Sequence, residues 1–351
     1  MEKVLMKGNQ AFAEACLRAG CRFFSGYPIT PQSDVLEYLC WRMDEVGGQC
    51  VQTESELAGV NMLYGAAAAG ARALTTTSGP GFSLKQEGIS YLCASDVPAV
   101  IMDVQRIGAG LGDIFVGQGD YWQLTRGGGH GDYRTIVLAP ASVQEMADVA
   151  AMSFDLAEKY RHPVIVAADA TIGQMMENVE LPEMKEHDIN TYDWALRPRQ
   201  EGEAQKVIWN RFWDIGNDEY PVYLCNKYAE MEENEQRWES VQTEDAEIVV
   251  VAYGISSRVA KSAVIRARKE GVKLGLIRPI TLWPYPKKAF DALGSQVKAI
   301  LDVEMNILGQ MRDDIILATG NRFPVEFYGE YWHTIDERKI VAKAKEMLEK
   351  Y

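Results

Sequence analysis

Hydrophobic residues in the first 170 positions gather in short runs that alternate with longer amphipathic stretches. Apolar runs such as "CRFF" (21–24), "RALTTT" (72–77) and "PAVIMDV" (98–104) have the length of buried strands. The stretches between them repeat apolar residues at helical spacing over ten or more positions. Short strands that alternate with helices predict an α/β fold, with a doubly wound parallel sheet that helices cover on both faces.

Two segments interrupt this alternation and divide the chain. Residues 105–132 are rich in glycine, which predicts a long irregular loop of the kind that is usually functional. Between about 183 and 245 the sequence becomes charged and aromatic, and "AEMEENEQRWES" (229–240) indicates a solvated surface helix. A second alternating unit follows it. We expect a first domain, a connecting segment and a smaller α/β domain, at residues 1–183, 184–245 and 246–351.

Composition and charge narrow the classes of function. The 351 residues are 47% hydrophobic, and 50 acidic against 36 basic residues give a formal net charge of −14. A chain this acidic is not expected to bind nucleic acid or an anionic membrane. We see no signal peptide and no membrane span, so we expect a cytoplasmic protein. The six cysteines form no CxxC pair and the four histidines lack metal-ligand spacing, so we expect buried free thiols and no metal site.

The segment "SGYPITPQSD" (25–34) breaks the first strand into a stiff loop. Pro28 and Pro31 bracket Ile29 and Thr30. Because proline fixes its own φ and keeps the preceding residue out of the helical region, Thr30 is held extended. Ligands of parallel sheets gather at the carboxyl ends of strands, which makes this loop a candidate site. The alternative is that the Thr30 hydroxyl satisfies its own loop backbone.

Further candidate side chains follow other strands. They are the acidic pair Glu54 and Glu56, the turn "SGPG" (78–81) and Arg106. Each has an ordinary alternative: a glutamate at a helix start is often a dipole or capping partner, a Gly-Pro turn is often only a turn, and an arginine is often on the surface. The glycines of "TRGGGHGD" (125–132) lack the context of a phosphate loop, so we reject that interpretation.

The spacing after Glu56 is more specific, because Gly65 follows it nine residues later in a helix rich in alanine. With the threonine-rich strand and "TSGPG", this pattern resembles the pyrimidine-binding domain of thiamine-diphosphate enzymes. The resemblance implies that Glu56, rather than Glu54, reaches N1′ of the aminopyrimidine, favours its imino tautomer and promotes the reactive ylid. The segment after Glu56 offers an apolar wall without positive charge, which favours a protonated carboxyl.

The full set of motifs resembles the pyrimidine-domain subunit of 2-oxoacid:ferredoxin oxidoreductases, over essentially the whole chain. These motifs are "GYPITP", "QTESELAGVNMLYGAAAAG", "TTTSGPGFSLKQEG", "DVQR" and "RPITLWPYP". The second unit resembles the transketolase C-terminal-like domain of that family. Uninterrupted "GYPITPQSDVLEYL", "GPGFSLKQEGISYL" and "GGGHGDYRTIVLAPASVQEM" are most similar to the 2-oxoisovalerate (3-methyl-2-oxobutanoate) type, while the 2-oxoglutarate and pyruvate types remain alternatives.

This resemblance implies an oxidative decarboxylation of a 2-oxoacid to acyl-coenzyme A and carbon dioxide, with electrons passed to ferredoxin. In it Glu56 activates the cofactor, and the Thr30 hydroxyl meets the 2-oxo or carboxylate group. Arg106 lies near the substrate carboxylate or coenzyme A, since a guanidinium suits a planar carboxylate. The residues expected to contact thiamine diphosphate are Glu56, Pro28, Ile29, Thr30, Gly79 and Gly81.

The sequence lacks the "GDG" that usually begins a site for the diphosphate and Mg²⁺, and it lacks a cysteine pattern for iron–sulfur clusters. The resemblance therefore implies a hetero-oligomer in which this chain binds only the pyrimidine half. The expected partners are a subunit with the diphosphate and Mg²⁺ site, a ferredoxin-like subunit with [4Fe-4S] clusters, a gamma-type subunit and ferredoxin itself.

Three other functions are consistent with parts of the sequence. Half of a non-oxidative thiamine decarboxylase or ligase would keep Glu56 but need no ferredoxin. A catalytically silent scaffold would stabilise a partner without using Glu56. A stand-alone binding module fits poorly, since only half of the expected ligand site is present.

Overall fold

The larger unit of the chain is built on a mainly parallel sheet, as the pattern predicts. The structure is a computed structural model that describes residues 3–199 and 201–351. The strand order is β13-β7-β8-β5-β4-β2-β3, with β6 paired to β5, and only the β13–β7 and β5–β6 pairings are antiparallel. These strands are β2 (Phe23–Gly26), β3 (Gln49–Gln52), β4 (Ala73–Thr77), β5 (Val100–Ile107), β6 (Asp113–Val116), β7 (Ile136–Leu138), β8 (Val164–Asp169) and β13 (Thr281–Trp283).

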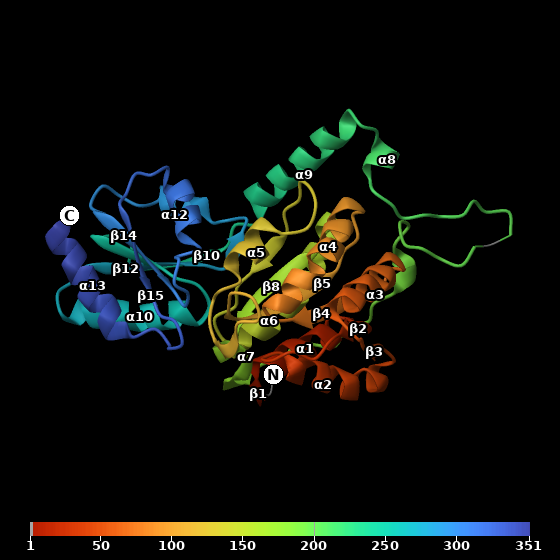
Figure 1. The fold of residues 1–351 in the computed structure, drawn as a ribbon, viewed down its shortest axis with the longest axis horizontal. Coiled ribbons are helices and arrows are strands. Elements are labelled where there is room, and N and C mark those ends of the chain that lie inside the picture. Colours follow the sequence, from red (N-terminus) through yellow and green to blue (C-terminus); the bar gives the residue numbers. More distant parts are fainter. Residues whose placement is uncertain (1–2, 200) are drawn as a thin grey trace.

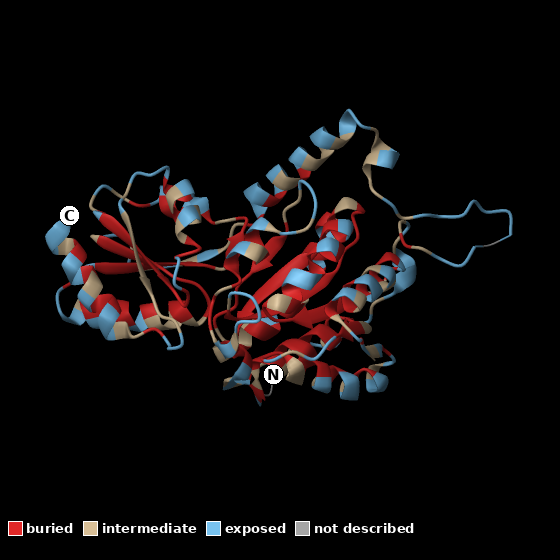
Figure 2. Ribbon diagram, in the orientation of Figure 1, coloured by how far each residue is buried: buried red, intermediate tan, exposed pale blue. Residues whose placement is uncertain are grey.

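Helices cover both faces of this sheet (Figure 1). Helix α1 packs against α2 and α6, whereas α3 packs against α4, and right-handed crossovers place these two groups on opposite faces. The sheet between them is buried (Figure 2), and every residue of β4, β5 and β8 is buried. The helices are α1 (Gly8–Arg18), α2 (Ser33–Arg42), α3 (Glu56–Ala68), α4 (Pro80–Ala94), α5 (Tyr121–Arg126), α6 (Val143–Tyr160) and α7 (Ala170–Gln174).

The smaller unit has its own sheet, in the order β10-β12-β11-β14-β15, which is parallel except for β10. Its helices α10 and α13 pack against each other. The elements are β10 (Trp238–Val241), β11 (Ile248–Val251), α10 (Gly254–Lys269), β12 (Leu274–Pro279), α11 (Lys287–Asp291), β14 (Ala299–Glu304), α12 (Arg312–Thr319), β15 (Val325–Gly329) and α13 (Glu337–Lys350). No helix in the described ranges is long and apolar enough to cross a membrane.

The remaining elements are short, apart from one long helix. They are β1 (Val4–Lys7), paired antiparallel with β9 (Met176–Val179), the 3₁₀ helices Asp44–Val46 and Ile189–Thr191, α8 (Phe212–Ile215) and α9 (Glu219–Asn234).

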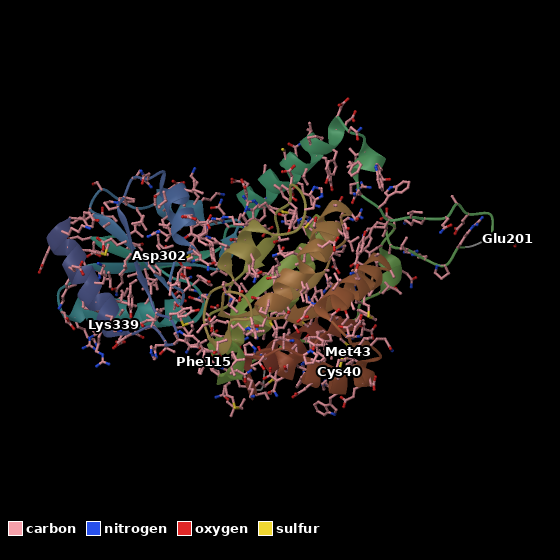
Figure 3. The ribbon with its side chains drawn as sticks, viewed as in Figure 1. Cys40, Met43, Phe115, Glu201, Asp302 and Lys339 are labelled. Carbon is pink, nitrogen blue, oxygen red and sulfur yellow. A yellow bond between two sulfur atoms is a disulfide. The ribbon has the colours of Figure 1, made fainter. Side chains whose placement is uncertain are left out.

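The two units are joined by packing as well as by the chain, because β13 from the second half completes the edge of the larger sheet. The side chain of Gln118 donates to the Tyr253 carbonyl oxygen and accepts from the Met305 N–H. Phe115, which lies where the units meet (Figure 3), packs edge-on against Trp332 at 5.7 Å between ring centroids. The smaller unit therefore supports the loops that follow β5.

The prediction of an irregular loop at 105–132 is wrong in detail. Strand β5 continues to Ile107, and both β6 and α5 lie within the segment. Polar anchors stabilise this order, since the Asp120 carboxylate accepts a hydrogen bond from the Arg106 N–H and Gln118 binds the second unit. Glycine content alone does not reveal such anchors.

The prediction that all six cysteines are buried free thiols is also wrong. Cys40 and Cys50 form a disulfide, because the end of α2 and the strand β3 bring their Cα atoms to 5.1 Å. Cys40 is labelled beside Met43 in Figure 3. The remaining cysteines are free: Cys16, Cys21 and Cys93 are buried, and Cys225 is exposed.

The surface helix expected at 229–240 is correct only as far as Asn234, where α9 ends. Strand β10 begins at Trp238 because it pairs with β12 of the smaller sheet. Between them Glu235 is buried and accepts hydrogen bonds from Lys159 and Tyr160, so this acidic position belongs to the core rather than to a solvated face.

Candidate functional site

The proline loop lies at the carboxyl end of β2, next to the ends of β3 and β4. Pro28 and Thr30 are exposed, and Ile29 is half-buried. The loop thus presents its predicted site residues to the outside of the chain, as a site shared with another molecule requires.

A buried glutamine that the sequence reasoning missed holds this loop. The Gln32 side chain donates to the Tyr27 carbonyl oxygen at 3.0 Å and accepts from the Thr76 hydroxyl at 2.5 Å. The Gln32 N–H also donates to the Ile29 carbonyl oxygen at 3.0 Å. Because Thr76 belongs to β4, the loop is fixed to the sheet, and the proline pair is only part of what makes it stiff.

Arg106 extends from the end of β5 to the same loop. Its side chain is buried; Nη1 donates to the Thr30 carbonyl oxygen at 2.8 Å and Nη2 to the Leu111 carbonyl oxygen at 2.7 Å. A Cβ at Gly79 would lie 3.2 Å from Nε of Arg106, and Gly79 has a φ of +49° that favours glycine. The structure therefore brings three predicted residues, Thr30, Gly79 and Arg106, into contact.

Two buried acidic residues, Asp120 and Asp103, lie close to Arg106. Asp120 accepts from the Arg106 N–H at 3.1 Å and from the Gln123 side chain at 2.7 Å, and that same amide of Gln123 donates to the Gly79 carbonyl oxygen at 3.1 Å. Burial raises the pKa of Asp120 to about 6. Burial, and then the charge of Asp120, raise the pKa of Asp103 well above its usual range.

Glu56 is the first residue of α3, and it is buried beside the "SGPG" turn. Ser55 caps the helix by accepting a backbone N–H at 3.2 Å. A Cβ at Gly81 would collide with Oε1 of Glu56 and with Oγ1 of Thr77. Only a glycine at position 81 leaves room for the Glu56 carboxyl in this place. Glu54, in contrast, is exposed.

A lysine that the sequence reasoning overlooked lies under Glu56. Lys85 is fully buried, and its Nζ donates to the Glu56 carbonyl oxygen at 3.2 Å and to the Thr75 hydroxyl at 3.1 Å. The sequence neighbours of Glu56 carry no positive charge, as noted above, but this tertiary neighbour does. The sequence could have indicated this neighbour, because Lys85 follows Gly81 by four residues and so lies on the same face of α4.

The turn between β4 and α4 connects the predicted site residues in a continuous line of contacts. Glu56 contacts Gly81, Gly79 contacts Arg106, and Arg106 binds the Thr30 carbonyl oxygen. Two buried polar atoms along this line, Oγ1 of Thr77 and Nε of Arg106, have no hydrogen-bond partner within the described ranges. The Glu56 carboxyl, the Thr77 hydroxyl and the glycines without side chains are suited to bind a flat heterocycle with ring nitrogens. The guanidinium of Arg106 is suited to bind a carboxylate.

A cavity of about 810 Å³ lies elsewhere, between α4, the loop 130–133 and α9. Its lining includes Tyr91, Tyr220 and Cys225 but none of the predicted site residues. We assign the candidate site to the strand ends rather than to this cavity, because the groups suited to chemistry converge there.

Comparison with known families gives two matches. Residues 14–248 match the family described as "Pyruvate flavodoxin/ferredoxin oxidoreductase, thiamine diP-bdg". Residues 246–340 match "Pyruvate:ferredoxin oxidoreductase core domain II". The two matches meet close to the start of the second unit, which they cover as far as residue 340.

Curated relatives match along nearly the whole chain. The ketoisovalerate oxidoreductase subunit VorB of Methanothermobacter marburgensis is 50% identical over 99% of this chain and 98% of its own length. VorB of Methanothermobacter thermautotrophicus is 48% identical over the same shares. The 2-oxoglutarate synthase subunit KorA of Methanocaldococcus jannaschii is 39% identical over 89% of this chain and 90% of its own length.

Two solved structures resemble the fold. A 2-oxoglutarate:ferredoxin oxidoreductase from Magnetococcus marinus, with 2-oxoglutarate, coenzyme A and succinyl-CoA bound, matches 99% of this chain with a TM-score of 0.86 and 26% identity. This chain spans 65% of the length of that one. A split-gene transketolase, described as an inactive beta4 tetramer, matches 98% of both chains with a TM-score of 0.60, and its 11% identity shows the fold alone.

Proposed function

The chain belongs to the pyruvate flavodoxin/ferredoxin oxidoreductase family, and from this premise we propose that it is the subunit that binds the pyrimidine half of thiamine diphosphate in a 2-oxoacid:ferredoxin oxidoreductase. The complex converts a 2-oxoacid and coenzyme A to acyl-coenzyme A and carbon dioxide, and it reduces ferredoxin. Its main substrate is 2-oxoisovalerate. The observation that carries this proposal is the line of contacts from Glu56 through the Gly79–Gly81 turn to Arg106 and Thr30.

Some residues of this line act on the cofactor, and others bind the substrate. Glu56 holds a proton at the pyrimidine ring, and Gly81 leaves the space its carboxyl occupies. When bound, thiamine diphosphate supplies the nucleophilic carbon that adds to the 2-oxo group. Thr30 and Arg106 orient the 2-oxoacid, since a hydroxyl suits its oxo group and a guanidinium suits its carboxylate. Fixing these groups before the reaction lowers its entropic cost.

The partner that holds the diphosphate and Mg²⁺ docks, in this proposal, against the outer surfaces of α3 and α4. These helices pack together and start on either side of the site. Each exposes large apolar side chains, with Leu57 at 45%, Met62 at 39%, Leu84 at 55% and Tyr91 at 47%. Such a group of exposed apolar residues supports a protein contact. The iron–sulfur subunit, the gamma-type subunit and ferredoxin complete the assembly we propose.

The choice of 2-oxoisovalerate rests on sequence identity. The relatives named ketoisovalerate oxidoreductase subunits are 50% and 48% identical to this chain, whereas those named 2-oxoglutarate synthase subunits reach 39%.

A substrate comparison tests the proposal. The chain is purified with its natural partner subunits, and reduction of a viologen dye is followed with 2-oxoisovalerate, 2-oxoglutarate and pyruvate in parallel. We expect turnover that requires coenzyme A and a kcat/KM at least about tenfold higher for 2-oxoisovalerate, which corresponds to about 1.4 kcal/mol of discrimination. A higher value for 2-oxoglutarate would contradict the proposed substrate, and equally fast dye reduction without coenzyme A would contradict the proposed reaction.

A further inference from the structure

Lys85 is a fully buried lysine whose place in the core is unusual, because a buried ammonium is costly unless it is paired. Its Nζ donates hydrogen bonds to the Glu56 carbonyl oxygen at 3.2 Å and to the Thr75 hydroxyl at 3.1 Å. Neither acceptor carries a formal charge. A Cβ at Gly59 would lie 3.2 Å from Nζ, so α3 passes directly over the amine. These contacts place the amine beneath the first turn of α3.

Among the residues that the structure describes, Glu56 is the acid that acts on the charge of this amine. The two acceptors of this amine come from Glu56 of α3 and Thr75 of β4, and Gly59 of α3 lies beside it. Burial lowers the pKa of Lys85 to about 8, and the charge of Glu56 opposes this shift. The lysine therefore still carries a proton at neutral pH and interacts electrostatically with Glu56.

We infer that Lys85 is a positioning residue for Glu56: it fixes the main chain of that residue through the hydrogen bond to its carbonyl oxygen, and it places a positive charge beside the start of α3. This inference rests on the proposed function only where it concerns the cofactor. A positive charge disfavours protonation of nearby groups. A pyrimidine ring bound at Glu56 would therefore be harder to protonate with the Lys85 ammonium in place than without it.

The first experiment needs no cofactor and no partner. The full chain is labelled with ¹³C at lysine Cε, and the titration of the Lys85 signal is followed by NMR in the wild type and in Glu56→Gln. We expect a midpoint near pH 8 in the wild type and a downward shift of about one pH unit in the variant, which lacks the opposing charge. An unchanged midpoint would overturn the inference, because the two groups would then not interact.

The second experiment examines the bound cofactor. The aminopyrimidine ring of thiamine diphosphate is titrated by near-ultraviolet circular dichroism in the assembled complex, with Lys85→Met and the matched control Lys227→Met. Lys227 is also buried, but it pairs with Asp96 and the Arg161 carbonyl oxygen. We expect the midpoint of the ring to rise by about one pH unit in Lys85→Met and to remain unchanged in Lys227→Met.

The outcomes separate this inference from the proposed function. If Lys85→Met binds thiamine diphosphate as the wild type does and its midpoint does not move, the inference is wrong while the role of Glu56 stands. If Glu56→Gln leaves the signal of the bound ring unchanged, the proposed contact itself is wrong. Should Lys85→Met fail to fold, the NMR comparison still decides, since both of its chains keep the lysine.

Discussion

Replacing Glu56 by glutamine is expected to lower the turnover of the assembled complex by about 10²- to 10⁴-fold, the usual range for a group that transfers a proton in catalysis. The amide keeps the size of the side chain but cannot carry the proton. Because the place beside Gly81 and Thr77 is retained, folding and assembly should be preserved. The measurement is dye reduction at saturating 2-oxoisovalerate, together with thermal unfolding of the variant.

Glu54→Gln is the matched control for this experiment. Glu54 lies two residues earlier and has the same side chain, but it is exposed. We expect its turnover to stay within about twofold of the wild type, as surface substitutions have small effects. If Glu56→Gln remains fully active, the chain is a scaffold that supports catalysis by another subunit. If Glu54→Gln is the inactive variant, the wrong acid has been assigned to the cofactor.

Replacing Gly81 by alanine is expected to reduce turnover about 10²-fold, although the substituted group touches no substrate. The new methyl group would occupy the space of the Glu56 carboxyl and of the Thr77 hydroxyl, and a displacement of about 1 Å is enough for such a loss. Alanine favours a helix, so α4 itself should tolerate the change. The same dye assay measures the effect, and far-ultraviolet circular dichroism confirms the fold.

A double-mutant cycle shows whether Gly81→Ala acts through Glu56. In the Glu56→Gln background the alanine has no functional carboxyl to displace, so we expect it to add less than about threefold to the loss. Residues in contact commonly show such coupling. A further 10²-fold loss in the double variant would mean that the two positions act independently, and the steric explanation would be wrong.

The architecture of the first domain was predictable because its strands and helices follow local periodicity. Runs such as "PAVIMDV" became the buried strand β5, and the alternation of elements indicated a parallel sheet. The resemblance to 2-oxoacid:ferredoxin oxidoreductases, drawn from short motifs, is confirmed by the family match over residues 14–248. Local periodicity and short sequence motifs were therefore enough to predict the fold class and the family.

Long-range contacts were not predictable in the same way. Gln32, Lys85 and Asp120 are polar residues in ordinary sequence surroundings, and each is buried only because a distant strand or helix covers it. The same is true of the Cys40–Cys50 disulfide, which needs the end of α2 to pass β3. The sequence placed candidate groups at strand ends, but the network that fixes them exists only in three dimensions.

The roles of Glu56, Thr30, Arg106 and the turn glycines remain predictions, and one measurement tests the central one directly. It is a density map of the assembled complex with thiamine diphosphate bound. We predict the Glu56 carboxyl within about 2.6–3.2 Å of a pyrimidine ring nitrogen, the reach of a hydrogen bond, while the diphosphate is held by another subunit. A pyrimidine ring that lies beyond the reach of Glu56, or that is bound wholly within the partner, would contradict this account.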